Sequence, residues 1–402
     1  MPHSALAALT SAIADAHASA MPLRVEGSGT WLSAGRPVAA TQALSTRELC
    51  GIIEYVPGDL VLTAHAGTTL GEIAHVTAQH GQWLALEPYA SHDALDSGTI
   101  GATIATASHG PLALGAGRAR DLILGLSVVT GNGTTVRAGG RVVKNVAGFD
   151  LVRLATGAWG TLGVIAQVSV RLHARPSIDE TFAIAIDLPT EPEAHDRALA
   201  QLIARLNSAP LLATTFSLAS LILLAHGAPT AVRAAHQLPD APIVLLARAT
   251  GNRTRVDAQR RALADIGPLS LVDTAVWRTI RTCDTGDTTL RITDAPLSSA
   301  TTWRQADTWL AAHGATNVRT VLEPVRGAIR VSCASAVTPG ASWSPPDRAI
   351  AERLPRGAWD AVPCAVNDRI AQRLREAFDP AGILNPGILG EASRVGAATT
   401  AR

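Results

Sequence analysis

The sequence Gly98-Thr-Ile-Gly-Ala-Thr-Ile-Ala-Thr-Ala-Ser-His-Gly110 contains no charged side chain in thirteen residues. Small residues fill nearly every position, so the backbone is left bare to approach something large and rigid. Its three glycines permit unusual dihedral angles and close approach. Runs of small residues also form tight turns in protein cores, so the surrounding motifs have to decide between the two interpretations. Short hydrogen-bonding arms come from the hydroxyl groups of Thr99, Thr103, Thr106 and Ser108.

Two further glycine-rich loops stand beside predicted strands. Arg24-Val-Glu-Gly-Ser-Gly-Thr30 is a strand end that enters a loop, and successive amides in such a loop form a nest for phosphate oxygens. Taken alone, this loop is explained better by a surface turn. Gly157-Ala-Trp-Gly-Thr-Leu-Gly163 precedes a strand that begins at Val164. Three loops of this kind in one half of the chain suit a long dinucleotide, with one loop on the pyrophosphate and the others along the isoalloxazine and adenine rings.

Other nucleotide and metal motifs are absent from the sequence. The Rossmann spacing G-x-G-x-x-G fails at Leu32 and at Arg120, and no G-x-x-x-x-G-K-[ST] occurs, which excludes P-loop nucleotide hydrolysis. The cysteines lie far apart and form no C-x-x-C pair, so we expect no zinc site, no iron–sulfur cluster and no other metal. With no dense disulfide framework, a reducing cytoplasm is the expected location. The four cysteines are Cys50, Cys283, Cys333 and Cys364.

The length of 402 residues suits two domains, each able to bury its own core. The net charge of +1 argues against an electrostatic nucleic-acid binder. An apolar stretch at Ala5–Ala14 lacks the basic start of a secretory signal and predicts a first amphipathic helix. The uncharged span between Arg205 and Arg233 contains prolines and polar residues, so it predicts a buried helix or strand rather than a membrane span.

Residues up to about 176 alternate turns with short strands. Ser45-Thr-Arg-Glu48 and Thr69-Leu-Gly-Glu72 both fit the capping box and predict two helices, the second closed by Gly81. Gly131-Asn-Gly133 between two apolar runs predicts a hairpin. Further strands are expected at 59–64 and 164–172.

In residues 177–365, strand and helix patterns alternate without a glycine-rich phosphate loop, which predicts an α+β substrate or cap domain. A last helix and turn at 366–402 are expected to pack back on the first domain, residues 1–176. Helices are expected at 193–206, 254–266, 300–313 and 367–378, and strands at 181–187, 243–249, 289–293 and 328–333.

With these elements in order, the chain resembles the FAD-binding domain of the vanillyl-alcohol oxidase flavoprotein family, also called the PCMH type. Within that family it is most similar to the FAD-binding E subunits of bacterial glycolate oxidases. The implied fold class is α+β, a PCMH-type two-subdomain FAD-binding fold with an α+β cap domain and a C-terminal helix returning to the FAD domain. The segments that carry the resemblance are Gly27–Thr30, Ala66–Leu70, Gly98–Thr106, Arg120–Gly125, Val143–Asp150, Gly160–Ile165 and Phe378–Gly387, with weaker anchors at Trp277-Arg278 and Leu290–Pro296.

The resemblance implies FAD as the cofactor and gives roles to particular residues. It implies that Gly27–Thr30 grips the pyrophosphate, that Gly98–Gly110 lines the phosphates and flavin, and that Val164 and Ile165 present backbone groups to the adenine half. Asn385 points toward the flavin pyrimidine edge in related enzymes. The cofactor-binding residues expected on this basis are Gly27, Ser28, Gly29, Thr30, Pro88, Gly98, Thr99, Gly101, Ala102, Thr103, Ala105, Thr106, Ser108, Gly110, Gly163, Val164, Ile165 and Asn385.

Two residues keep two interpretations each. Lys144 is the single lysine of the chain, and it is either a charge-stabilising group or part of a structural ion pair. His109 lies inside the glycine-rich run and is either an acid/base group facing the flavin or a supporting residue behind it.

The chain also departs from the family. Covalent members attach flavin through a histidine in the first glycine loop, and this chain has none there, so noncovalent binding is expected. The H-x-G-D-G kind of segment that binds metal in catalytic D-2-hydroxy-acid dehydrogenases is missing as well. Catalytic residues are therefore not assigned.

The resemblance implies an FAD-binding subunit of a glycolate oxidase or dehydrogenase complex, which oxidises glycolate to glyoxylate. It implies two partners, a second FAD-containing subunit and an iron–sulfur subunit, no nucleic acid, and a membrane contact only through those partners. The alternative is a self-sufficient FAD-dependent oxidoreductase of hydroxy acids or alcohols. A structural partner that has lost FAD is a third possibility.

Overall fold

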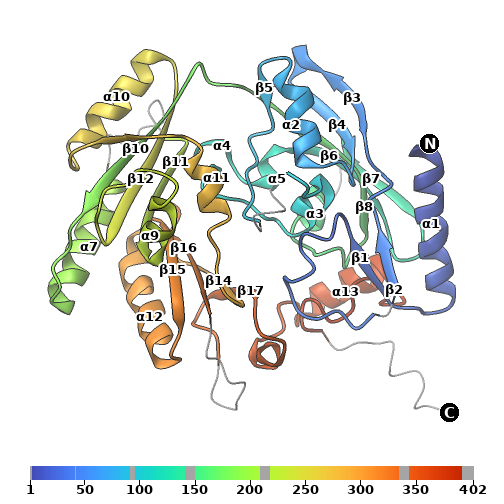
Figure 1. The fold of residues 1–402 in the computed structure, drawn as a ribbon. Helices are drawn as coiled ribbons and strands as arrows, with labels where there is room; N and C mark the ends of the chain where they lie inside the picture. The colour runs from blue at the N-terminus through green and yellow to red at the C-terminus, as the bar shows by residue number, and fades with distance from the viewer. Residues whose placement is uncertain are drawn as a thin grey trace. The chain divides into compact units, whose positions relative to one another are not determined.

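The computed structural model describes residues 2–40, 42–90, 96–140, 150–208, 218–334 and 344–391. The chain divides into two compact units, which are described separately (Figure 1). The first unit comprises residues 1–109, 117–175 and 363–402, and the second comprises residues 110–116 and 176–362. Among the residues described, no helix is long and apolar enough to cross a membrane.

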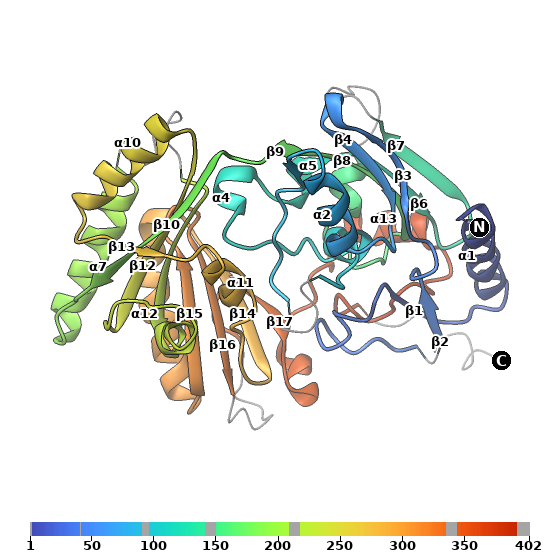
Figure 2. The same cartoon turned by 45° about the horizontal axis from the view of Figure 1, so that its top comes forward.

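An antiparallel five-stranded sheet with the order β3-β4-β8-β6-β7 is the centre of the first unit. Helices α2, α3 and α5 supply side chains to a core with this sheet, and Figure 2 shows α2 beside β4. Strand β8 is buried along nearly its whole length, because apolar side chains cover both of its faces. The elements are β3 (Ile52–Val56), η1 (Pro57–Asp59), β4 (Val61–His65), α2 (Leu70–Ala78), α3 (Ile100–Ala105), α5 (Ala119–Leu122), β6 (Ile123–Val129), β7 (Thr135–Gly139), α6 (Leu151–Ala155) and β8 (Val164–Arg171).

Strands β1 and β2 form a smaller parallel pair in the first unit. Leu23 in β1 also forms a parallel bridge with Leu384, so the segment after the last helix lies beside the first strand. Ile13 of α1 packs with Leu23 and Leu384 in one core. The elements are α1 (Pro2–Ala18), β1 (Leu23–Glu26), β2 (Gln42–Ser45), the short pair β5 (Gln82–Trp83) and β9 (His173–Ala174), and α13 (Arg369–Phe378).

The second unit contains an antiparallel eight-stranded sheet with the order β13-β10-β12-β11-β15-β16-β14-β17. Side chains from α7, α10 and α12 form a core on one face of the sheet, and side chains from α9 and α11 form another core. The elements are α4 (Ala113–Ala116), β10 (Ile178–Ile186), α7 (Pro192–Leu206), β11 (Ser220–His226), α9 (Gly227–Arg233), β12 (Ile243–Gly251), α10 (Arg253–Ala264), β13 (Ser270–Val272), α11 (Val276–Arg281), β14 (Thr288–Thr293), η3 (Pro296–Ser298), α12 (Ser299–Ala312), β15 (Thr316–Glu323), β16 (Ala328–Ala334), β17 (Ala349–Arg353) and η4 (Arg356–Ala361).

Most of the strong local signals are confirmed. The Thr69 side chain accepts a hydrogen bond from the Glu72 amide and begins α2, as the capping box predicts. Gly131-Asn-Gly133 turns the hairpin between β6 and β7, with Val129 opposite Thr135. The helices expected at 193–206, 254–266, 300–313 and 367–378 are α7, α10, α12 and α13. The uncharged span after Arg205 contains the buried strand β11.

The helix expected after Ser45 is wrong. Ser45 ends β2, and its hydroxyl accepts a hydrogen bond from the Arg47 amide in a local turn. The Thr46 amide donates to the Glu26 carbonyl at 2.8 Å, so the backbone groups of this capping box serve the β1–β2 pair. A serine hydroxyl accepts a hydrogen bond in a turn as readily as at the start of a helix, so the motif alone did not distinguish the two structures.

Candidate cofactor-binding site

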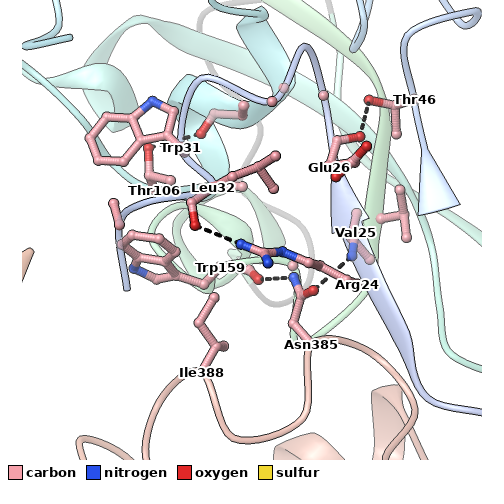
Figure 3. A pocket seen from close by; sticks show the side chains of 18 of the residues that line it. Arg24, Val25, Glu26, Trp31, Leu32, Thr46, Thr106, Trp159, Asn385 and Ile388 are labelled. Carbon is pink, nitrogen blue, oxygen red and sulfur yellow. Dashed lines mark hydrogen bonds between the residues drawn. The ribbon is translucent and has the colours of Figure 1, made fainter. Parts of the chain in front are cut away.

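A pocket with about 740 Å³ of empty space, part of it open to solvent, lies in the first unit. Four segments far apart in sequence build its walls, and Figure 3 shows them from close by. The lining residues are Arg24, Val25, Glu26, Gly27, Gly29, Thr30, Trp31, Leu32, Ala34, Val38, Thr46, Gly101, Ala102, Ala105, Thr106, Trp159, Gly160, Val164, Ile165, Asn385 and Ile388.

The first wall is the loop after β1. Gly29 has a φ of +85°, which favours glycine. Within the described part of the chain, the amides of Ser28, Gly29 and Thr30 donate no hydrogen bond, and the buried Ser28 Oγ has no partner. Successive loop amides without a protein partner can bind the oxygens of an anionic ligand. A diphosphate is such a ligand.

The second wall is α3, which comes from the charge-free run. The Thr99 side chain caps it by accepting from the Ala102 amide at 3.3 Å. A Cβ on Gly101 would lie 2.7 Å from the Ala66 Cβ, so only glycine lets this helix pack so closely there. Ala102, Ala105 and Thr106 then face the pocket with short side chains, which leaves room for a ligand.

The third wall is the loop from Gly157 to Gly163, which is fastened to α3. The Gly157 amide donates to the Ile104 carbonyl at 3.0 Å, and the Trp159 amide donates to the Ala105 carbonyl at 2.8 Å. Trp159 itself has a φ of 52°, an unusual conformation for a bulky residue. The loop leads into β8, whose first residues Val164 and Ile165 line the pocket.

The fourth wall is the turn after α13. Asn385 is 4% exposed, and its side-chain amide is already engaged with protein backbone. Before it, the carboxylate of Asp379 accepts hydrogen bonds from the Ile383 and Leu384 amides at 3.1 and 2.9 Å and so shapes the turn. Burial raises the pKa of Asp379, although these backbone hydrogen bonds oppose the rise.

The charged side chains of the pocket are few. Among the described lining residues, only Arg24 and Glu26 carry titratable groups, and both belong to β1. One guanidinium nitrogen of Arg24, Nη2, donates to the Leu32 carbonyl at 2.7 Å. Across the described ranges, no group of three or more His, Cys, Asp or Glu side chains is placed to hold a metal ion. The arrangement suits binding and orientation of a ligand more than acid–base chemistry.

The structure brings ten of the eighteen expected site residues into the pocket wall. Ser28, Thr103 and Gly163 are direct sequence neighbours of lining residues but do not line the pocket, and Thr99, two residues before Gly101, does not line it either. Pro88, Gly98 and Ser108 are outside the pocket as well, and Gly110 belongs to the second unit. The ten are Gly27, Gly29, Thr30, Gly101, Ala102, Ala105, Thr106, Val164, Ile165 and Asn385.

Two residues, His109 and Lys144, had two interpretations each. The half-buried His109 lies with its Nδ1 3.0 Å from the Ala107 carbonyl and is not in the pocket wall. Lys144, with the rest of 143–149, lies outside the described residues.

Sequence reasoning missed the aromatic part of the wall. Trp31 and Trp159 line the pocket together with Leu32 and Ile388. Both tryptophans stand inside or directly after glycine loops that were already singled out. Large aromatic residues in such loops are the signal that points to them.

Comparison with known proteins agrees with this geometry. Residues 4–139 match the model of the FAD binding domain family. Over 155 residues the chain is 41% identical to glycolate oxidase subunit GlcE of Escherichia coli, which covers 39% of this chain and 43% of that protein. Over 180 residues it is 32% identical to D-lactate dehydrogenase of Archaeoglobus fulgidus, covering 44% of this chain and 39% of that protein. The chain thus matches less than half the length of these relatives.

The fold is shared with solved structures. A structure of p-cresol methylhydroxylase with substrate bound superposes with a TM-score of 0.68 at 16% identity, covering 95% of this chain and 86% of that one. The α+β, PCMH-type fold expected from the sequence is confirmed.

The class of this protein follows from the pocket and the family match together. Residues 4–139 form an FAD-binding domain of the PCMH type, and the chain is a flavoprotein whose cofactor is FAD. The pocket fits that cofactor, because loop amides without a hydrogen-bond partner and a wall of small side chains meet in one place.

Proposed function

We propose that this chain is an FAD-dependent oxidoreductase that serves as the FAD-binding subunit of a glycolate oxidase-type complex. The single observation that carries the proposal is the convergence of the three glycine-rich segments on one pocket whose loop amides are free to bind a diphosphate. The similarity to glycolate oxidase subunit GlcE supports the choice of complex. In such a complex, glycolate is oxidised to glyoxylate with a second FAD-containing subunit and an iron–sulfur subunit.

Within the pocket, each wall has a proposed task. The amides of Gly27–Thr30 hold the pyrophosphate, and Val164 and Ile165 lie along the adenine half. Ala102, Ala105 and Thr106 leave space for the cofactor through their short side chains. Pro88, Gly98 and Ser108 lie outside this pocket and are assigned to the flavin half. When bound, FAD supplies the ring that accepts and passes on electrons.

The protein's own contribution is then binding and orientation. Binding is noncovalent, because the first glycine loop offers no histidine. The two charged lining residues, Arg24 and Glu26, are on β1, and the described wall holds no histidine, lysine, cysteine or tyrosine. This composition favours a subunit that holds FAD for electron transfer over one that deprotonates a hydroxy acid itself.

The domain assignment belongs to the same proposal. Residues 1–176 are the FAD domain, 177–365 the cap domain, and 366–402 a C-terminal element of the FAD domain. The contact between Leu384 and Leu23 supports the last part. We also place the chain in the cytoplasm, with membrane contact only through its partners; its four free cysteines support a reducing compartment.

A self-sufficient oxidoreductase of 2-hydroxy acids is the second candidate. The similarity to a D-lactate dehydrogenase over 180 residues favours it. The two candidates differ in whether the isolated chain reduces its own flavin.

One experiment separates the candidates. The chain is purified alone, its flavin absorption spectrum is recorded, and glycolate or D-lactate is added without oxygen. We expect a yellow protein whose spectrum stays unchanged, and glycolate-dependent dye reduction only in the co-purified complex. Bleaching of the isolated chain supports the second candidate, and a colourless protein that takes up no FAD contradicts both. Dye reduction by the complex that persists after deletion of this chain contradicts the subunit role.

A further inference from the structure

Asn385 lies at the junction of three segments of the first unit. Its Oδ1 accepts a hydrogen bond from the Val25 amide at 2.7 Å, and its Nδ2 donates to the Trp159 carbonyl at 2.7 Å, as Figure 3 shows. Its own amide donates to the Leu23 carbonyl at 2.9 Å. An N–H partner requires the oxygen and a C=O partner requires the NH₂ group, so the two partners fix the orientation of this side chain.

The backbone conformation of Asn385 also favours this residue type. Its φ is 44°, in the left-handed region that asparagine enters more readily than most side chains. The Leu23 amide donates to the Ile383 carbonyl at 2.7 Å, so the turn is held on β1 by backbone hydrogen bonds on both sides of Leu384. A Cβ on Gly160 would lie 3.0 Å from the Asn385 Nδ2, which shows how closely the third loop packs against the Asn385 side chain.

The partners of Asn385 belong to different walls of the pocket. Val25 leads through Glu26 into the first glycine loop. Trp159 is fastened to α3 through the bond from its amide to the Ala105 carbonyl. The buried side-chain amide of Asn385 therefore links the first wall to the third, and through Trp159 to α3. Both of its hydrogen bonds are made with backbone atoms.

We propose that Asn385 is a positioning residue that couples docking of the C-terminal turn to assembly of the FAD pocket. The inference rests on the proposed use of this pocket for FAD. The side chain holds β1 and the third glycine loop at the separation that the cofactor needs. By linkage, bound FAD stabilises the docked turn as much as the docked turn favours FAD.

Three variants test the coupling. Asn385→Asp has the same shape and keeps an acceptor for Val25, but it places a carboxylate oxygen against the Trp159 carbonyl. Ile383→Val loosens the same turn without touching a pocket hydrogen bond, since Ile383 is fully buried in the core. Asn317→Asp is the matched control, because Asn317 has a φ of 51° but lies exposed in the second unit.

The measurements are FAD affinity of the apoprotein, followed by flavin fluorescence, and the unfolding midpoint without FAD. Asn385→Asp is expected to weaken FAD binding by about tenfold to hundredfold, the effect of one buried carbonyl left without its donor. Ile383→Val is expected to weaken FAD binding less than Asn385→Asp does at equal loss of stability, because it breaks no hydrogen bond between the pocket walls. Asn317→Asp is expected to bind FAD nearly as the unmodified chain does. FAD should also protect the C-terminal turn from protease in the unmodified chain and not in Asn385→Asp.

Two results overturn the inference. One is an Asn385→Asp variant that binds FAD as tightly as the unmodified chain. The other is a loss of affinity no larger than that of Ile383→Val at equal loss of stability, which reduces Asn385 to a general structural role. Failure of the proposed function is recognised separately, because the unmodified apoprotein would then bind no FAD. Faster hydrogen exchange of the Trp159 amide in the Asn385→Asp apoprotein reports displacement of the third loop without any cofactor, whereas the Val25 amide keeps its acceptor.

Discussion

The indole rings of Trp31 and Trp159 meet edge to face, with their centroids 6.0 Å apart and an interplanar angle of 84°. Trp31 follows the first glycine loop and Trp159 lies inside the third, so this contact joins two pocket walls that are far apart in sequence. Edge-to-face pairs contribute about 0.5–1.5 kcal/mol beyond the area they bury. The pair is therefore a second link between the walls, independent of Asn385.

Removal of either tryptophan should weaken FAD binding. We expect Trp31→Ala and Trp159→Ala each to lower FAD affinity. The double variant should lose about 0.5–1.5 kcal/mol less binding free energy than the two single variants lose together. FAD titration of the four proteins measures this cycle. Trp309→Ala, in the second unit, is the control for loss of an indole, and its FAD affinity should be unchanged. Strictly additive effects would mean that the ring contact does not connect the walls.

Gly27 cannot accept a side chain in the present structure. A Cβ there would lie 2.4 Å from the Thr99 Oγ1, at the start of α3. Gly27→Ala should therefore push the first loop from its place and reduce FAD binding. Gly58→Ala is the matched control, because a Cβ at Gly58 meets nothing within 4 Å. FAD titration compares the two.

Relief of the clash provides an internal check on Gly27. The second substitution Thr99→Ala removes the colliding hydroxyl, at the cost of about 1 kcal/mol for a lost helix cap. The double variant Gly27→Ala/Thr99→Ala should thus bind FAD better than Gly27→Ala alone. A double variant that binds worse than either single variant would show that the loop is displaced for another reason.

The stability of the first unit should depend on pH through the carboxyl group of Asp379. Burial raises the pKa of this carboxyl above its ordinary 3.8, so the folded protein binds this proton more tightly than the unfolded chain does. The stability linked to that proton is present below pH 3.8 and is lost as the pH rises through the raised pKa. Asp379→Asn cannot titrate, and it offers one acceptor oxygen to two amides, which costs about 1–3 kcal/mol for the unsatisfied donor.

Unfolding midpoints from acidic to neutral pH test this. The stability difference between the unmodified chain and Asp379→Asn should be largest at acidic pH and should narrow as the pH rises. Asp15→Asn, on the exposed side of α1, controls for the loss of a charge. A difference that widens with rising pH would contradict the raised pKa.

A buried ionic cluster should be essential to the second unit. Arg330, only 7% exposed, donates to the carboxylates of Asp284 and Glu352 at 2.5 to 2.9 Å. Burial alone raises the pKa of Glu352, but Arg330 and Arg291 outweigh it and hold that pKa below its ordinary value. Arg330→Met leaves both carboxylates without this partner, which should cost about 3–5 kcal/mol.

The pH dependence of this cluster has the opposite sign to that of Asp379. Stability contributed by Glu352 is present above pH 4.5 and lost as the pH falls, so Arg330→Met should be most damaging near neutral pH. Thermal unfolding measures both effects. Arg253→Met removes an arginine that is 60% exposed and should change stability by about 0–1 kcal/mol. Equal effects of the two substitutions would show that the cluster is not buried as described.

Local signals in the sequence predicted local structure well. Thr69 caps α2 and Gly131-Asn-Gly133 turns a hairpin, because each needs only its neighbours in the chain. Ser45 shows the limit: the same kind of cap motif was overruled when the Thr46 amide found the Glu26 carbonyl on a neighbouring strand. The three glycine-rich segments were identified because small residues and bare amides are visible without any tertiary contact.

The rest of the pocket depends on contacts that no local pattern contains. The role of Asn385 is an example: its amide contacts Val25, 360 residues earlier in the chain, and its carbonyl partner on Trp159 lies in a different loop. The pairing of Trp31 with Trp159 is equally nonlocal. Such residues become visible only when the sheet brings their loops together.

The bridge between Leu23 and Leu384 has a consequence for biosynthesis. A ribosome that has made the first glycine loop must still add all of the second unit before it reaches the segment that completes the pocket wall. A growing polypeptide thus has no finished site for its cofactor, and FAD can be captured only once translation has passed Asn385 and that residue has left the exit tunnel.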